Sequence, residues 1–209
     1  NLEALGAEHA NLTARALRFG ACRKADDLWR LLGVSDPAAL ATLGLDDFVA
    51  AAASLRFDGR RDAATVHAAG APPENGADTW RALVDRLFPE GHAIRCAGQL
   101  LAGEARVSGH RVAVVGTSGH APIGFEIALA LAGEVLRVIR EEPQRPLVIL
   151  VDTQGHRLSR RDELLGLTSF MAHLATGIDL ARHRGHRVVG LVYDQAVSGG
   201  FFVTGLMAD

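Results

Sequence analysis

The feature that most constrains this chain is the alternation of strand and helix patterns in its second half. Two continuous apolar stretches, "RPLVILVD" and "HRVVGLVYD", are separated by a long amphipathic segment, and a similar segment precedes the first of them. Strands that are apolar on both faces are typical of a parallel sheet that is covered on both sides. The order strand, helix, strand, helix, strand predicts crossover connections in an α/β domain.

The segments around these strands carry their own signals. In "PIGFEIALALAGEVLRVIREEP" and "RDELLGLTSFMAHLATGIDLARHRG", apolar residues recur at intervals of three and four, so we expect one helix in each. Upstream, "QLLAGEARVSGHRVAVVG" predicts a β-hairpin with Ser108 and Gly109 in its turn. The stretch "DTWRALVDRLFPEG" predicts a short amphipathic helix that ends at Pro89 and Gly91.

The first part of the chain has a different character. Residues 1–55 are rich in alanine and leucine, which favours helices throughout, and Asp36 is the expected N-cap before Pro37. Residues 56–78 contain glycine, proline and alanine with little periodicity, so we interpret them as a linker. The α/β domain is then expected over residues 79–209. Because the chain begins without methionine and stops within an expected element, we interpret it as a fragment.

Composition narrows the functions to be considered. The formal net charge of -2 gives no electrostatic reason to expect a nucleic-acid partner. The two cysteines, Cys22 and Cys96, lack C-x-x-C spacing, which argues against a disulfide scaffold or a zinc ribbon. No apolar run is long enough to span a bilayer, and no export signal is visible. We therefore expect a cytoplasmic protein with no membrane partner.

Ligands of parallel α/β sheets bind beyond the carboxyl ends of the strands, and two loops of this chain are expected there. The first, "VDTQGHRLSRRDE", begins at Asp152, which we expect to fix its own loop through hydrogen bonds to nearby amides. It turns at Gln154 and Gly155 and places Arg160 and Arg161 at a helix start, where the helix dipole disfavours cations. The pattern leaves two alternatives open: these arginines are solvated or paired with acidic neighbours, or they hold an anionic substrate.

The second loop, "YDQAVSGG", runs from a strand into Gly199 and Gly200. It lacks the lysine of a P-loop, the spacing of a dinucleotide fingerprint and the Gly-x-Ser-x-Gly of a nucleophile elbow. Either the glycines let a helix pack close to the sheet, or their bare amides face a partial negative charge. We interpret Ser198 as the residue that caps the following helix.

Taken together, these motifs resemble the carboxyltransferase branch of the crotonase superfamily, whose members carry an Asp-Thr-Pro-Gly turn, a helix with a glutamate, a strand and a Ser-Gly-Gly helix start. The segments "FPEGHAIR", "GTSGHAPIGFEIALA" and "DTQGHRLSRRDELLGL" are similar to the gamma subunit of biotin-independent malonate decarboxylase. The resemblance covers residues 80–209, with Gln154 where the general pattern has proline. It implies a crotonase-like fold of ββα units, incomplete at its carboxyl end. The segment "ALRFGACRKADDLWRLLGVSDPAAL" resembles the tail of the beta subunit, which implies a fusion.

The resemblance also implies a reaction. In this family the beta and gamma subunits jointly decarboxylate a malonyl thioester on an acyl carrier protein, and an alpha subunit is the acyl transferase. The carrier holds the substrate on a phosphopantetheine-type arm derived from dephospho-CoA, and neither a metal nor a directly bound cofactor is implied. Loss of CO2 leaves a thioester enolate, whose oxygen is stabilised by preorganised amides.

The expected site residues follow from this chemistry. The amides of Gly199 and Gly200 are expected to form an oxyanion hole beside the turn at Gln154 and Gly155. His156 or Tyr193 is expected to supply the proton that the enolate requires. Further residues are expected at the substrate, with His120 either capping a helix or facing the carrier arm: Arg157, Arg160, Arg161, Ser198 and His120. Two alternatives stay open, a biotin-dependent acyl-CoA carboxyltransferase subunit and a crotonase-like assembly partner without catalysis.

Overall fold

The computed structural model describes residues 1–20 and 79–209 of the chain. The first range forms a single helix, α1 (Leu2–Gly20), as its alanine- and leucine-rich pattern predicts. The rest of the expected helical segment, with Asp36 as its N-cap, and the whole of the expected linker lie outside the described residues. The boundaries proposed for these parts therefore stay predictions.

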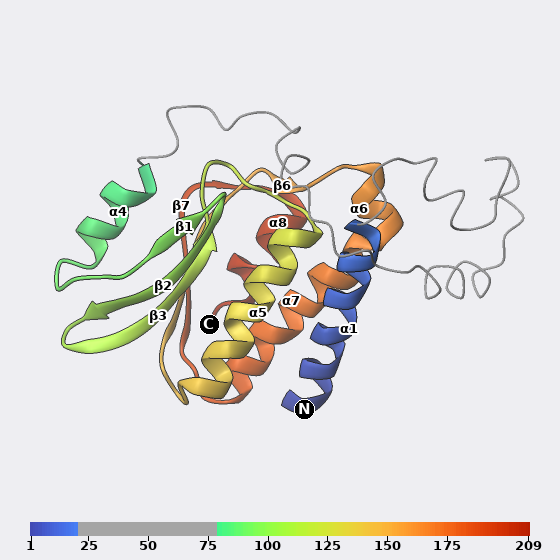
Figure 1. Ribbon diagram of the computed structural model, residues 1–209. Helices are drawn as coiled ribbons and strands as arrows, with labels where there is room; N and C mark the ends of the chain where they lie inside the picture. The colour runs from blue at the N-terminus through green and yellow to red at the C-terminus, as the bar shows by residue number, and fades with distance from the viewer. Residues whose placement is uncertain (21–78) are drawn as a thin grey trace, which may run out of the picture. The chain divides into compact units, whose positions relative to one another are not determined.

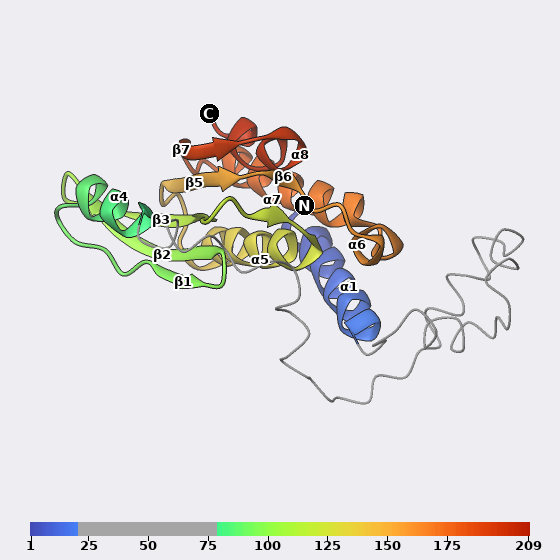
Figure 2. The same ribbon diagram turned by 90° about the horizontal axis from the view of Figure 1, so that it is seen from above.

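Residues 79–209 form a five-stranded sheet with the order β1-β2-β3-β5-β7. Its strands are β1 (Arg95–Ala97), β2 (Leu100–Val107), β3 (His110–Thr117), β5 (Leu147–Thr153) and β7 (Val188–Ala196). The first three strands are antiparallel, whereas β3, β5 and β7 run parallel. Figure 2 shows β1 and β7 at opposite edges of this sheet. The predicted parallel strands and the predicted hairpin are both confirmed.

Helices cover both faces of the sheet. The helices of this range are α4 (Thr79–Leu87), α5 (Phe125–Glu141), α6 (Arg160–Leu165), α7 (Leu167–His183), α8 (Ser198–Phe202) and the short 3-10 helix η3 (Gly205–Met207). The crossover helices α5 and α7 lie side by side on one face, and α4 lies on the other (Figure 1). Two short strands, β4 (Pro122–Ile123) and β6 (Gly155–His156), form a separate parallel pair. No helix in the described part of the chain is long and apolar enough to cross a membrane.

The hairpin between β2 and β3 shows how a local signal fixes the register. Ser108 and Gly109 both have positive φ, 50° and 75°, as a two-residue turn between antiparallel strands requires. The carboxylate of Glu90 accepts hydrogen bonds from both turn amides, at 2.6 and 2.7 Å. The turn that the sequence predicts is thus confirmed, and a side chain from the preceding loop holds it.

Apolar side chains form a core on each face of the sheet. Beneath α4, the buried residues are Trp80, Val84, Phe88, Leu101, Val112, Val114 and Leu150. On the other face, α5 and α7 bury Leu131, Val135, Phe170, Leu174 and Ile178. Because full burial of such a side chain contributes roughly 1.5–3 kcal/mol, these two cores hold the strand ends in fixed positions.

The single helix expected over residues 161–185 is wrong in one respect. The segment forms two helices, α6 and α7, which meet at Gly166. Gly166 has a φ of 75°, a left-handed conformation that ends α6 and redirects the chain into α7. The apolar spacing of three and four continues through this break, so periodicity alone did not reveal it.

The expectation that both faces of the last apolar strand are covered is also wrong for the described residues. Strand β7 lies at an edge of the sheet, and Val189 and Val192 remain 54% and 44% exposed. Leu191 and Tyr193 pack against the core beneath α4. An apolar sequence therefore marked this strand, but its place in the sheet determined how much of it is buried.

Candidate functional site

The candidate site lies where β3, β5 and β7 end. Three loops follow these strands, and Thr153 at the end of β5 connects them. Its hydroxyl donates a hydrogen bond to the carbonyl of Ala121, at 2.6 Å, and its carbonyl accepts one from the amide of Val197, at 3.1 Å. The sequence placed two of these loops at the site, and the structure adds the third, residues 118–121.

Asp152, at the start of the first loop, joins this loop to the other two. Its side chain is 3% exposed, and its carboxylate accepts hydrogen bonds from the amide of His120, at 2.8 Å, and of Gln195, at 3.2 Å. The expected bonding of Asp152 to nearby amides is confirmed, with one correction. The amides belong to the two neighbouring loops, because a side chain at a strand end reaches across the sheet edge as readily as along its own chain.

The glycine turn begins α8, but Ser198 does not cap it. The N-cap is Val197, and no side chain accepts a capping hydrogen bond, so that prediction is wrong. Ser198 is exposed and has a φ of 52°, an uncommon conformation for a residue with a side chain. The first hydrogen bond of the helix runs from the amide of Phe201 to the carbonyl of Val197. Within the described ranges, the amides of Ser198, Gly199 and Gly200 have no recorded acceptor.

The two glycines differ in their surroundings. A Cβ on Gly200 would lie 2.6 Å from Oγ1 of Thr153 and 2.9 Å from the backbone of Gly155, so Gly200 lets α8 pack directly on β6. A Cβ on Gly199 would instead meet two side chains, the ring of His156 and the Met171 methyl, each at 3.2 Å. The close-packing interpretation thus applies to Gly200, and Gly199 faces the side chains of the neighbouring cavity.

That cavity has a volume of about 390 Å³. Its lining residues come from β6, from the helices α6 and α7 and from the segment after α8: His156, Glu163, Leu167, Thr168, Met171, Ala172 and Val203. His156 therefore lies between the cavity and the glycine turn. Of the residues predicted for the site, the structure brings together Gly155, His156, Ser198, Gly199 and Gly200, while Gln154 lies exposed beside them.

The basic loop is paired within the protein. Arg157 bonds the fully buried Asp162 through Nε at 2.7 Å, and it also bonds Glu126 on α5. Asp162 further accepts from the amide of Phe125 and from Ser159, whose side chain caps α6. Burial by itself would raise the pKa of Asp162, but these hydrogen bonds outweigh burial and lower it. Arg157 therefore anchors the loop, and the structure offers no support for its expected contact with substrate.

The two arginines at the start of α6 are exposed. Arg161 bonds Glu126 at 3.0 Å, and its guanidinium lies 4.9 Å from the ring centre of Phe125. Arg160 is the first residue of α6. For Arg161, the alternative of pairing with an acidic side chain is favoured, but the acid is on α5 rather than next to it in sequence. A role for Arg160 at the substrate stays a prediction.

The surroundings of Tyr193 do not suit a proton donor. Its hydroxyl donates to the carbonyl of Thr117, at 2.8 Å, and its ring packs against the core beneath α4. Burial, together with the nearby acidic groups Asp152, Cys96 and Asp194, raises the pKa of Tyr193. A phenol with a raised pKa and a committed proton is a poor acid, so the structure favours a structural role.

His120 does not cap a helix, because the N-cap of α5 is Gly124. Its ring Nε2 lies 3.0 Å from Asp194 and 3.7 Å from Asp152. The hydrogen bond that the His120 ring donates to Asp194 is the main reason that the pKa of His120 is raised. The sequence analysis missed Asp194, although its place after an apolar strand, like that of Asp152, was a usable signal. The ligand atoms of these three residues lie within 4.8 Å of one another, so they are close enough to hold a cation, and the absence of a metal stays a prediction.

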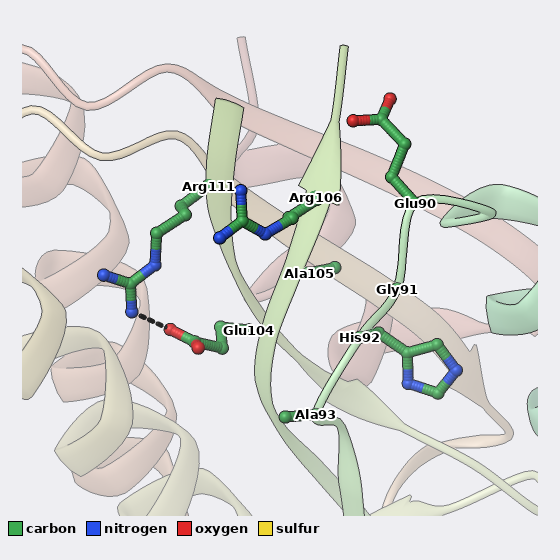
Figure 3. Close-up of a pocket in the computed structure, with 8 residues that line it drawn as sticks. All are labelled: Glu90, Gly91, His92, Ala93, Glu104, Ala105, Arg106 and Arg111. Carbon is green, nitrogen blue, oxygen red and sulfur yellow. Dashed lines mark hydrogen bonds and ion pairs between the residues drawn. The ribbon is translucent and has the colours of Figure 1, made fainter. Parts of the chain in front are cut away.

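A second, smaller hollow lies far from these loops in the fold, between β2 and the segment that follows α4. Its volume is about 160 Å³, and Figure 3 shows its charged side chains. Glu104 pairs with Arg111, while Glu90 holds the hairpin turn. His92 bonds Asp85 at 2.9 Å. These groups are used to stabilise the hairpin, so we place the candidate site at the strand ends.

The candidate site lies within the stretch of chain that comparisons with known proteins match. Residues 118–209 match the family model described as the malonate decarboxylase gamma subunit. A curated relative is the malonyl-S-ACP:biotin-protein carboxyltransferase MADD of Malonomonas rubra, 30% identical over 93 residues. The match covers 42% of this chain and 32% of that relative, so the chain spans about a third of its length.

Solved structures show the same fold. The Pseudomonas malonate decarboxylase MdcD-MdcE hetero-dimer matches with a TM-score of 0.53 and 27% identity, over 61% of this chain and 56% of the matched chain. The beta subunit of geranyl-CoA carboxylase from P. aeruginosa matches with a TM-score of 0.52 over 64% of this chain and 25% of that chain, and at 22% identity it supports the fold alone. These comparisons confirm the crotonase-like α/β fold and the resemblance to the gamma subunit.

Proposed function

We propose that this chain is the gamma-type part of a malonate decarboxylase, and that it acts with a beta counterpart to convert a malonyl thioester into an acetyl thioester. One observation carries the proposal. The stretch that matches the gamma-subunit family, residues 118–209, contains the glycine turn and every residue that lines the adjacent cavity. The part of the chain with a family likeness is therefore also the part that can accommodate a small acyl group.

The chemistry requires a site for a developing negative charge. Decarboxylation breaks the bond between the carboxylate carbon and the α-carbon; CO2 leaves, and the electron pair enters the thioester as an enolate. In the proposal, the open amides of Gly199 and Gly200 donate to the enolate oxygen. Because Gly200 packs against Gly155, these donors are held in place before the reaction, and loss of one such donor typically costs about 2.7–4 kcal/mol.

The proposal includes the partners of the reaction. The acyl group would enter the cavity beside His156 on the phosphopantetheine-type arm of an acyl carrier protein, loaded by an acyl transferase alpha subunit. Two comparisons support the beta counterpart and the carrier protein: the matched Pseudomonas structure is a hetero-dimer of MdcD and MdcE, and the name of the Malonomonas relative specifies malonyl-S-ACP. Gln154 and Gly155 would border the thioester, because their turn adjoins Ser198.

An amide-to-ester replacement tests the oxyanion hole. Replacing the backbone amide of Gly200 by an ester removes the N–H without adding a Cβ that would strike Gly155. In the complex with the beta counterpart, kcat is expected to fall by roughly 10²–10³, while substrate binding changes less, because the charge develops only in the transition state. The matched control is an ester at Thr204, which does not line the cavity and whose amide bonds the carbonyl of Phe201 at 3.2 Å. Normal turnover in the Gly200 ester would contradict the proposal.

A second function is favoured by one observation. The curated relative from Malonomonas rubra is named as a biotin-protein carboxyltransferase, so the same fold could pass the carboxyl group to biotin instead of releasing it. Inhibition of the complex by avidin, with recovery of carboxylated biotin, would support this alternative. If the complex assembles and its turnover is unchanged by both ester replacements and by avidin, this chain is instead an assembly partner without catalysis.

A further inference from the structure

One apolar side chain, Met171, bounds the space between the glycine turn and the cavity. A Cβ on Gly199 would lie 3.2 Å from the Met171 methyl group and 3.2 Å from Nδ1 of His156. Both residues also line the cavity of about 390 Å³. We infer that Met171 selects for an unsubstituted malonyl group, because its methyl group occupies the space that a substituent on the α-carbon would need. This inference rests on the proposed function and names the acyl group that its site accepts.

The core of the domain fixes the backbone of Met171. The residue lies in the second turn of α7, between Phe170 and Leu174, which are both fully buried. Leu167 and Ala172, from the same part of α7, line the same cavity. Because protein cores are close-packed, α7 is not able to move away from the glycine turn without opening the core. Any adjustment to a larger acyl group is therefore left to the Met171 side chain.

The glycine turn is fixed from the opposite side. A Cβ on Gly200 would lie 2.6 Å from Oγ1 of Thr153 and 2.9 Å from the backbone of Gly155, so the turn has no room to retreat. Gly155 itself is tightly packed, since a Cβ there would lie 3.3 Å from both Ser198 and Val197. An acyl group at the turn is thus enclosed between rigid backbone and the end of the Met171 side chain.

The geometry of decarboxylation determines which part of the acyl group meets Met171. The bond to the departing carboxylate must stand across the plane of the thioester, because its electron pair has to align with the carbonyl. The two other substituents of the α-carbon then lie near that plane, one beside the oxygen and one beside the sulfur. With the oxygen at the amides of Gly199 and Gly200, the substituent beside the oxygen is the one that approaches Met171.

Malonyl and methylmalonyl groups differ at this position. A malonyl group has hydrogen atoms on both sides, whereas a methylmalonyl group has one methyl, and its enantiomer determines whether that methyl lies beside the oxygen or beside the sulfur. Only one enantiomer should therefore collide with Met171. Because a methionine side chain is flexible, we expect the exclusion to be partial, within the range of about 10–200-fold for one extra methylene in an apolar pocket.

The other residues that line the cavity are less suited to this role. Among the described residues, the side chains nearest to a Cβ on Gly199 are those of His156 and Met171. His156 is polar, so its removal would alter the charge and hydrogen bonding of the site as well as its size. Glu163 and Thr168 are exposed. Met171 is therefore the position at which size alone can be changed.

The test measures kcat/KM for CO2 release in the complex with the beta counterpart. The substrates are the pantetheine thioesters of malonate and of each methylmalonate enantiomer. The wild-type complex should discriminate between the enantiomers by about 10–200-fold. Met171→Ala should nearly abolish this discrimination by raising the rate of the disfavoured enantiomer, while the volume-conserving Met171→Leu should retain it. Met207→Ala is the matched control, because Met207 lies in η3 and does not line the cavity.

The comparison of enantiomers separates selectivity from a structural effect, since a loosened α7 would change the rates of all three substrates alike. Thermal unfolding checks that Met171→Ala is folded, and Met171→Val, which removes less of the side chain, should lower the discrimination part of the way. Equal rates for both enantiomers in the wild-type complex would overturn the inference. So would Met171→Ala and Met171→Val variants in which neither enantiomer gains, or in which both gain alike. A wild-type complex that releases no CO2 from the malonyl thioester would instead overturn the proposed function itself.

Discussion

The loops that follow β5 and β7 lie at the same edge of the sheet, but they differ in how their polar groups are used. In the first, Arg157 is neutralised by Asp162 and Glu126, so the most charged segment of the site uses its charge internally. In the second, Gly200 packs on Gly155 through backbone alone, and the amides of the turn are left open. The comparison teaches that charge in a loop does not identify the chemical site, because paired charges stabilise structure while unpaired backbone donors remain available.

The largest effect is expected from removing the Arg157–Asp162 ion pair in the loop after β5. Asp162→Asn removes the negative charge from a fully buried side chain and leaves Arg157 with the partly exposed Glu126 as its remaining acidic partner. Loss of one partner of a buried ion pair typically costs about 3–5 kcal/mol, which urea unfolding would measure. Asp179→Asn on α7 is the matched control, because its pair with Arg182 is exposed and should contribute less than about 1 kcal/mol. Equal losses in the two variants would mean that the loop is not held by this pair.

Adding a methyl group at the glycine turn should destabilise the fold, because the space there is already filled. In Gly200→Ala the new methyl group would strike Thr153 and the backbone of Gly155, so we expect a loss of stability of roughly 1–3 kcal/mol together with a loss of activity. Gly199→Ala meets only the side chains of His156 and Met171, which can shift, so its stability should change less. Thermal unfolding and turnover of both variants would check this order. The reverse order would show that α8 does not pack on β6 as described.

A smaller, pH-dependent effect distinguishes Asp162, which follows β5, from His120, whose partner Asp194 lies in the loop after β7. The protonated form of His120 stabilises the fold, so its contribution is complete below the ordinary histidine pKa of about 6.5 and is lost as pH rises through the raised pKa. Asp162 has the opposite sign: its lowered pKa contributes stability above the ordinary value, which is lost as pH falls through the lowered one. Unfolding free energies of the wild type and Asp194→Asn between pH 5 and 9 should differ most at the acidic end. A constant difference would rule out the contribution of His120.

The smallest effect is expected from Arg161→Ala. Its pair with Glu126 is exposed, so the loss of stability should stay below about 1 kcal/mol, and KM should be unchanged. The alternative from the sequence, in which Arg161 holds an anionic group, predicts a rise in KM that corresponds to about 1.5–3 kcal/mol. Steady-state kinetics of this variant in the complex therefore decide between the two interpretations.

The sequence by itself determined the parts of the structure that depend on local patterns. Apolar runs and periodic spacing identified β5, β7, α5 and the hairpin turn at Ser108, because burial and backbone preference act over a few residues. The motifs at the ends of β5 and β7 were sufficient for the resemblance to the gamma subunit. The same local reasoning missed the break at Gly166, since a helix boundary needs only one residue in a left-handed conformation.

Only the tertiary structure decided which groups meet. Glu126 is 31 residues from Arg157, and Asp194 is 74 residues from His120, so no spacing rule could pair them. Whether Gly200 serves packing or chemistry depended on its approach to Gly155, and the burial of β7 depended on its place at the sheet edge. The physical reason is that hydrogen bonds and ion pairs form between side chains that packing brings within a few ångströms, and packing is a property of the whole fold.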